Sequence, residues 1–405
     1  MSGFQHFNVA DVAEINAFAR NLGPYIHSIE RSCVRLVLIP AMPKRIAILG
    51  ASGSVGSALA SHILRARLLE PEDRLLLVGH GVLTTERKLL STRIDLMDAF
   101  DDERVRMEVV PDVSDVDADI VIVAAGVTIS STNPTRRDLG AANRAIFEHI
   151  ADQCVTRLSQ ALFIVVSNPV ELAVKIFSFA LDRRRVIGIG AQQDSLRFAR
   201  AIAADLRVSR HDVRATVMGE HGAAMIPLWR SVELMSDNPR ATDHLARLFV
   251  SSAELPLESR LAALRSEVSQ LLSEERISES YALTQRALPD ARIFVEPYIT
   301  AHCLHSTPNA TANAALQCVA AALANDHRRI HGQVDLRGEV LGLNGVCGIP
   351  LTISKNGWNS EPLDWLESDE ISAVKKSTQS IEDFISGILI NAVTATLPSE
   401  ALLAT

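Results

Sequence analysis

Several features are scarce in this sequence of 405 residues, and each absence excludes a class of protein. No stretch approaches the ~18 uncharged apolar residues that a membrane-spanning helix needs. Positive charge is not in excess, because 40 Lys and Arg stand against 48 Asp and Glu, for a formal net charge of −8. A basic surface that could hold nucleic acid or an anionic membrane is therefore not expected. We predict neither nucleic acid nor a membrane as a partner.

Cysteine is also sparse. The five cysteines form no CxxC pair and are odd in number, which favours a reducing, cytoplasmic compartment over a disulfide framework. Residues 1–42 carry acidic side chains and lack a charged-then-apolar pattern, so they resemble neither a transit peptide nor a secretory signal. We therefore expect an N-terminal extension at 1–42 and a cytoplasmic location.

The apolar residues that are present form short buried runs. Hydrophobic residues make up 47% of the chain, which suffices for a globular protein of about two domains. The runs at 45–49, 74–78, 119–126 and 162–168 alternate with helical segments, the first at 57–69. Continuous apolar strands between helices predict an α/β fold with a parallel sheet covered on both faces.

A glycine-rich turn follows the first predicted strand. In the motif GASGSVG, Gly50 permits a tight turn, Gly53 lets the backbone approach a pyrophosphate, and Gly56 lets the helix pack on the strand. Ser54 and Val55 then bring free N–H groups at a helix N-terminus to the phosphates. Such a motif alone is equally typical of a plain strand-to-helix turn. Its place after the first strand of an alternating pattern favours a Rossmann dinucleotide-binding site.

The end of the second strand leaves the choice of dinucleotide open. An acid that binds the adenosine ribose usually stands there, but this chain has Val78-Gly79-His80. Loss of the acid permits a 2′-phosphate, which His80, Arg87 or Lys88 could pair with. Alternatively, Gly79 and His80 simply open a turn and the cofactor is still NAD. The cofactor is thus predicted as NAD or NADP.

Four short motifs occur together further along the chain: TRRDLGAAN (135–143), SNPVE (167–171), DSLR (194–197) and MGEHG (218–222). In this order and spacing they resemble the lactate/malate dehydrogenase family. The resemblance covers about 44–230 and again 335–385. It implies an oxidoreductase that transfers a hydride between a nicotinamide cofactor and a 2-hydroxy acid/2-oxo acid pair. It also implies a small-molecule substrate and a homodimer or homotetramer.

The resemblance assigns catalytic and substrate-binding roles. His221 is the implied proton donor and acceptor, and Asp194 orients its ring. Arg197 would bind the substrate carboxylate, Arg136 would polarise the reacting carbonyl, and Asn168 would hydrogen-bond the substrate oxygen near the nicotinamide. These residue types suit the chemistry, because hydride transfer to a ketone builds negative charge that an arginine stabilises and a histidine quenches. Taken singly, each residue also fits an ordinary loop, cap or surface role.

Further residues complete the predicted cofactor site. Gly126, after the strand at 119–126, and Asn143 are expected to contact the cofactor together with Asn168. A segment at 127–137 is expected to close over the site and exclude water. No metal site is predicted.

The patterns divide the chain into three predicted parts. Residues 1–42 are the extension, 43–187 are the dinucleotide-binding Rossmann domain with a doubly wound parallel sheet, and 188–405 are an α+β catalytic domain. The last part includes a helical insertion at about 235–300, hairpin strands at 335–355 and a final helix at about 367–392. Thr311 is a predicted pocket residue.

One departure concerns the substrate. Malate-type members carry an arginine where this chain has Ile129, and the segment 128–135 contains no basic residue. A second carboxylate on the substrate would lie unpaired there, which costs free energy. The segment therefore favours a substrate with a neutral side chain and argues against malate. An arginine supplied by the insertion remains an alternative.

Two other functions stay open. A non-catalytic dinucleotide-binding protein would explain the missing strand-end acid. An NAD-dependent glycosidase shares the Rossmann core, but would need Cys and His metal ligands near the NP turn, where Ser167 precedes Asn168.

Overall fold

The computed structural model describes residues 43–100, 105–128, 135–304, 307–354 and 356–396. The predicted extension at 1–42 and the position Ile129 lie outside these residues. The strands are β1 (Arg45–Leu49), β2 (Arg74–Val78), β3 (Arg106–Val110), β4 (Ile120–Val123), β5 (Leu162–Val165), β6 (Val186–Gly188), β7 (Val213–Gly219), β8 (Met225–Leu234), β9 (Arg329–Arg337), β10 (Asn344–Ser354) and β11 (Gly357–Ser360). The helices are α2 (Ser54–Arg65), α3 (Leu83–Ala99), α4 (Arg136–Arg157), α5 (Val170–Ala180), α6 (Gly190–Leu206), α7 (Pro239–Glu254), α8 (Leu257–Ser273), α9 (Ile277–Thr284), α10 (Pro289–Leu304), α11 (Pro308–Ala324) and α12 (Ser368–Thr396).

The strands form one sheet in the order β3-β2-β1-β4-β5-β6-β9-β10-β7-β8, with β11 beside β10. The first six strands pair in parallel, and the order reverses between β1 and β4. The predicted α/β fold with a doubly wound parallel sheet is thereby confirmed. From β6 onward the pairing is antiparallel, so the sheet continues across the predicted domain boundary at 187.

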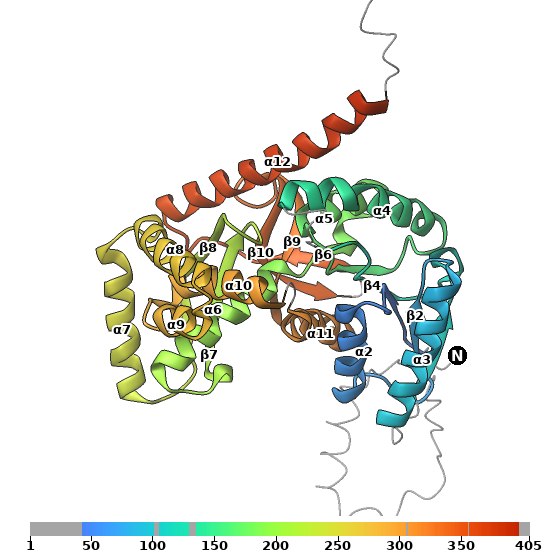
Figure 1. Cartoon of the computed structure of the whole chain (residues 1–405), viewed down its shortest axis with the longest axis horizontal. Coiled ribbons are helices and arrows are strands. Elements are labelled where there is room, and N and C mark those ends of the chain that lie inside the picture. The colour runs from blue at the N-terminus through green and yellow to red at the C-terminus, as the bar shows by residue number, and fades with distance from the viewer. Residues whose placement is uncertain (1–42, 101–104, 129–134, 305–306, 355, 397–405) are drawn as a thin grey trace, which may run out of the picture. The chain divides into compact units, whose positions relative to one another are not determined.

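The parallel strands are apolar throughout because helices cover both of their faces. In β1, Ile46 and Ile48 pack in one core cluster while Ala47 and Leu49 pack in another. Helices α2, α3 and α11 contribute to the first cluster, and α4, α5 and α12 cover the opposite face (Figure 1). Alternate side chains of one strand thus reach two cores, which explains the continuous hydrophobic runs.

The observed elements differ from the predicted ones at a few places. Helix α2 begins at Ser54 rather than at residue 57, because the last part of the glycine-rich turn already forms its first turn. Strand β3 was not predicted, since this sheet-edge strand has only one buried residue in RMEVV. Strand β8 was also not predicted. It pairs with β7, and most of its residues are half-exposed, so it lacks a continuous buried run.

The predicted helical insertion consists of α7, α8, α9 and α10. These helices pack with α6 and β7 in a third core cluster. Because α10 also reaches the cleft beside α6, the insertion contributes to the pocket described below.

His331 in β9 predicts a pH dependence of stability. Its ring bonds Gln192 and Thr216, and burial, with a smaller effect of Arg329, lowers its pKa to about 3. Between that value and the unfolded pKa of about 6.5, the unfolded chain binds a proton that the folded chain does not. The free energy of unfolding should therefore fall by about 1 kcal/mol per pH unit as pH falls through this window.

The variant His331→Gln should lose this contribution. Urea unfolding at about pH 7 and about pH 5 would show a smaller pH effect in the variant than in the wild type. An equal pH effect in both proteins would contradict the neutral, buried imidazole.

Candidate active site

A pocket of about 410 Å³ opens at the carboxyl ends of β1, β4 and β5. This is the point where the strand order reverses, which is where ligands bind in open α/β sheets. Segments after these strands form one side, and residues of α6, the β7–β8 loop, α8, α10 and α11 form the other. Its polar and turn residues include Val55, Gly126, Thr128, Ser167, Asn168, Gln193, Asp194, Arg197, His221, Arg265, Thr307 and Thr311.

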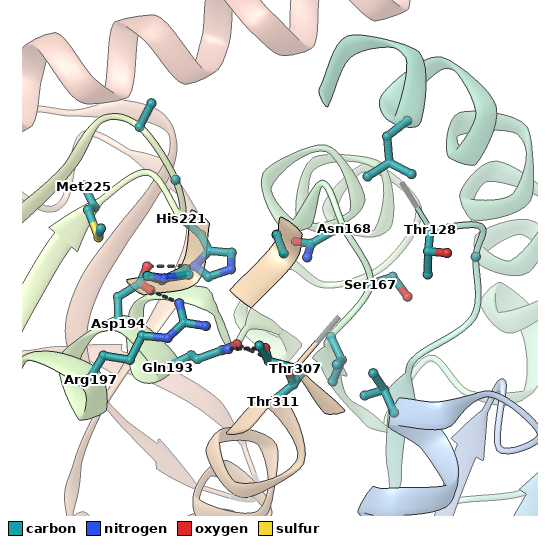
Figure 2. Close-up of a pocket in the computed structure, with 18 of the residues that line it drawn as sticks. Thr128, Ser167, Asn168, Gln193, Asp194, Arg197, His221, Met225, Thr307 and Thr311 are labelled. Atoms are coloured by element: carbon teal, nitrogen blue, oxygen red, sulfur yellow. Dashed lines mark hydrogen bonds and ion pairs between the residues drawn. The ribbon is translucent and has the colours of Figure 1, made fainter. Parts of the chain in front are cut away.

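The predicted histidine, aspartate and arginine lie together in this pocket (Figure 2). Asp194 and Arg197 are three residues apart on α6, so both side chains leave the same face of the helix. Asp194 Oδ2 lies 2.7 Å from His221 Nδ1, and Arg197 donates to Asp194 Oδ1 at 2.9 Å. His221 reaches this position because β7 ends at Gly219 and the following loop turns toward α6.

Asp194 is ionised despite being buried. Burial alone would raise the pKa of its carboxyl, but the charges and hydrogen bonds of His221 and Arg197 outweigh burial and lower that pKa. An ionised carboxylate can only accept hydrogen bonds, so Nδ1 of His221 carries a proton. Nε2 is consequently the ring nitrogen left for a ligand in the pocket. This arrangement can donate a proton to, or accept one from, a bound oxygen.

The glycine-rich turn has the shape of a phosphate cradle. Gly50 has φ +81°, and a Cβ there would lie 2.7 Å from the carbonyl oxygen of Ala124. A Cβ at Gly56 would lie 2.4 Å from the carbonyl oxygen of Gly50, so this helix packs directly on the turn. Helix α2 begins after Gly53 without a side-chain cap and has no acidic residue in its first turn, which contains Ser54 and Val55. Its N–H groups therefore suit the diphosphate of a dinucleotide.

Asn143 joins two segments that line the pocket. Its buried amide accepts from the N–H of Val127 at 2.7 Å and donates to the carbonyl oxygen of Asn168 at 2.7 Å. It thereby joins the segments that follow β4 and β5. Gly126 and Asn168 line the pocket, whereas Asn143 does not. Figure 2 shows Asn168 across the cavity from Asp194 and Arg197.

Arg136 lies near the pocket but does not line it. Its guanidinium binds Glu171 at 2.7 Å, pairs also with Glu220, and lies 4.6 Å from the ring centroid of Phe384. Glu171 accepts from the backbone N–H of His221 at 2.6 Å. Arg136 is thus connected to the histidine loop through a buried carboxylate, a link that sequence reasoning missed because three distant segments form it.

The side chains considered for a 2′-phosphate lie at the end of β2 and on α3. His80 is exposed and bonds Thr85 at 2.8 Å, and both Arg87 and Lys88 are exposed. Gly79 and His80, rather than an acid, directly follow Val78, so this edge is compatible with either dinucleotide.

Thr311 lines the pocket together with Gln193 and Thr307, which were not predicted as site residues. Gln193 Nε2 lies 3.4 Å from Thr307 Oγ1, and Thr311 Oγ1 lies 3.4 Å from Gln193 Oε1. Gln193 directly precedes Asp194 in the chain, and this position could have indicated that Gln193 lies near the pocket. Arg265 of α8 also lines the pocket, and only the folded insertion reveals this.

Two structural features are absent from the described ranges. They contain no cluster of three or more His, Cys, Asp or Glu side chains that could hold a metal ion. Nor does any helix in them have the length and apolarity needed to cross a bilayer.

Comparisons with known proteins show which family and which enzymes this chain is similar to. Residues 44–188 match the family model described as lactate/malate dehydrogenase, NAD binding domain. A malate dehydrogenase of Chlorobium phaeobacteroides is 28% identical over 347 residues, covering 84% of this chain and 96% of that protein. An L-2-hydroxycarboxylate dehydrogenase (NAD(P)(+)) of Methanocaldococcus jannaschii is 27% identical over 354 residues, covering 84% and 97%.

Solved structures share the fold. Malate dehydrogenase from Plasmodium falciparum in complex with NADH aligns with a TM-score of 0.63 and 22% identity, covering 85% of this chain and 99% of that one. Lactate dehydrogenase from Eimeria maxima with NADH and oxamate gives a TM-score of 0.67 and 19% identity, covering 89% and 99%. At these identities the likeness establishes the fold alone.

Proposed function

We propose that His221, Asp194 and Arg197 carry the reaction of this nicotinamide-dependent 2-hydroxy acid oxidoreductase, whose residues 44–188 match the lactate/malate dehydrogenase family model. The observation that supports this proposal best is the hydrogen-bonded row of these three side chains in one pocket. The pocket also includes Val55 of the phosphate-binding turn, which brings acid–base chemistry and dinucleotide binding together.

The proposed reaction is the reversible reduction of a 2-oxo acid. The nicotinamide supplies the hydride when bound. Arg197 binds the carboxylate beside the reacting carbon with its planar guanidinium. His221 would donate the Nε2 proton to the carbonyl oxygen as negative charge develops there, and would accept it in the reverse direction. Asp194 keeps the ring oriented and balances its positive charge. We propose that Arg136 stabilises charge on the same oxygen. Because its guanidinium is bound to Glu171 and Glu220 outside the pocket lining, this role requires Arg136 to leave these carboxylates when the substrate binds.

The proposed cofactor site uses backbone groups more than side chains. The turn and the first turn of α2 would hold the phosphates through Gly50, Gly53, Ser54, Val55 and Gly56. Gly126 and Asn168 would lie against the nicotinamide half, with Asn143 fixing both of their segments. The cofactor is NAD or NADP.

Three further statements belong to this proposal. Residues 43–187 would form the dinucleotide-binding domain and 188–405 the catalytic domain. The protein would be cytoplasmic and would form a homodimer or homotetramer. Size-exclusion chromatography with light scattering measures the oligomeric state. No specific observation on the described residues favours either rival function.

The absorbance of reduced nicotinamide tests the function directly. Purified protein would be supplied with NADH or NADPH and with 2-oxo acids that bear neutral, acidic, aromatic or polar side chains. Consumption of the reduced cofactor with at least one acid is the expected result. Tight cofactor binding without turnover of any acid would contradict the proposal and favour a non-catalytic dinucleotide-binding protein.

A further inference from the structure

The insertion brings a second arginine into the active-site pocket. Arg265 lies on α8, and with residues of α10 it lines the same cavity as Arg197, Asp194 and His221. The α10 residues that accompany it are apolar: Ile293, Phe294, Pro297 and Ala301. One wall of the pocket is therefore hydrocarbon with a single guanidinium.

Arg265 has no acidic partner in the part of the chain that the structure describes. Arg265 instead contacts an aromatic ring: its guanidinium carbon lies 5.8 Å from the ring centroid of Phe294, and the residue is exposed. Other arginines of the insertion are bound to carboxylates, namely Arg260 to Asp290, Arg276 to Glu279 and Arg292 to Asp205. Arg265 is thus a cation in the pocket whose charge remains available to a ligand.

The charges of the pocket lining are unbalanced. Its charged side chains, apart from His221, are Asp194, Arg197 and Arg265. The single carboxylate is already bound by both His221 and Arg197. A substrate with one carboxylate would engage Arg197 and leave Arg265 unmatched. A substrate with a second anionic group would match both arginines.

We propose that Arg265 binds a carboxylate on the side chain of the 2-oxo acid, so that the inserted helix α8 selects the substrate. This inference rests on the proposed function. It differs from the expectation, based on the composition of residues 128–135 alone, that the substrate has a neutral side chain. The substrate class is a 2-oxo dicarboxylate. Its hydrocarbon spacer lies against the apolar wall formed by α10, and its distal carboxylate binds the guanidinium.

Pairs of substrates that differ only in charge test this proposal. Oxaloacetate is isosteric with 4-methyl-2-oxopentanoate, and 2-oxoglutarate with 5-methyl-2-oxohexanoate. The wild-type kcat/KM should be higher for the acidic member of at least one pair. Arg265→Gln should lower that value by about 10- to 100-fold, mainly through KM, because one charge-assisted contact is lost. The kcat/KM for the neutral member should change by less than about twofold. Arg265→Lys should retain part of the preference for the acidic member.

Arg247→Gln is the matched control, since it removes the same charge from an exposed position on α7 outside this pocket. This variant should leave kcat/KM unchanged for both members of each pair. A wild-type preference for the neutral acids would overturn the proposal. So would an equal loss for both members in Arg265→Gln.

A binding measurement separates this proposal from the proposed function. Succinate and glutarate would be titrated by calorimetry into the protein with its reduced cofactor, alongside the isosteric monoacids 4-methylpentanoate and 5-methylhexanoate. Tighter binding of a dicarboxylate that is lost in Arg265→Gln would support Arg265 even if no 2-oxo acid were turned over. Turnover of 2-oxo acids without this binding preference would contradict the role of Arg265 and leave the oxidoreductase function intact.

Discussion

His221→Asn is expected to lower kcat by about 10²- to 10⁴-fold, the usual contribution of a positioned proton donor. The asparagine amide can still donate to Asp194, which lies 2.7 Å from the native ring. The buried carboxylate therefore keeps a partner, but no group remains that exchanges a proton near neutral pH. Steady-state kinetics with reduced nicotinamide measure the effect.

Cofactor affinity distinguishes this loss from a folding defect. The hydrogen bonds of His221 are to Asp194 and Glu171 and not to the phosphate-binding turn at 50–56. The dissociation constant of NADH or NADPH should therefore stay within about twofold of the wild-type value. His211→Asn is a suitable control, because His211 is exposed and lies outside the pocket. Full activity in His221→Asn would refute the assignment of the proton donor.

Arg197→Gln is expected to lower kcat/KM by about 10²- to 10⁴-fold, since two charge-assisted hydrogen bonds to the substrate carboxylate are lost. Arg197 also donates to Asp194 at 2.9 Å and helps to lower the pKa of that carboxyl. His221 still pairs with Asp194 in the variant, so the aspartate stays partnered.

Two comparisons isolate the carboxylate contact. Arg197→Lys keeps the charge but lacks the planar fork, so it should recover only part of the loss. The methyl ester of the best 2-oxo acid has no carboxylate at this position, so wild type and Arg197→Gln should differ far less with the ester. An equally large loss with the ester would show that Arg197 acts through Asp194 rather than through the substrate.

Local patterns in the sequence predicted the parts of the site that depend on neighbours in the chain. The strand β1 and the turn after it follow from a short apolar run and its glycines. The shared face of Asp194 and Arg197 follows from helical spacing alone. These features need no knowledge of the tertiary fold, which is why β1 and the position of the turn agree with the structure.

Features that depend on distant segments were not predictable in this way. Arg136 meets Glu171 and Glu220 from three separate elements, and no sequence spacing relates them. Arg265 belongs to an amphipathic helix whose pattern does not specify which cavity it borders. Its place in the pocket depends on how the inserted helices pack against α6.

Transfer of an isotopic label tests the central claim, which is hydride transfer in a site where His221 supplies the proton. The protein would be given a 2-oxo acid and reduced nicotinamide deuterated at C4, with each of the two faces labelled in turn, and the product would be analysed by mass spectrometry. The proposed mechanism predicts a 2-hydroxy acid with deuterium at C2 from one labelled face, and almost none of this product from His221→Asn. A 2-hydroxy acid without the label from either face, or labelled product formed equally fast by His221→Asn, would contradict it.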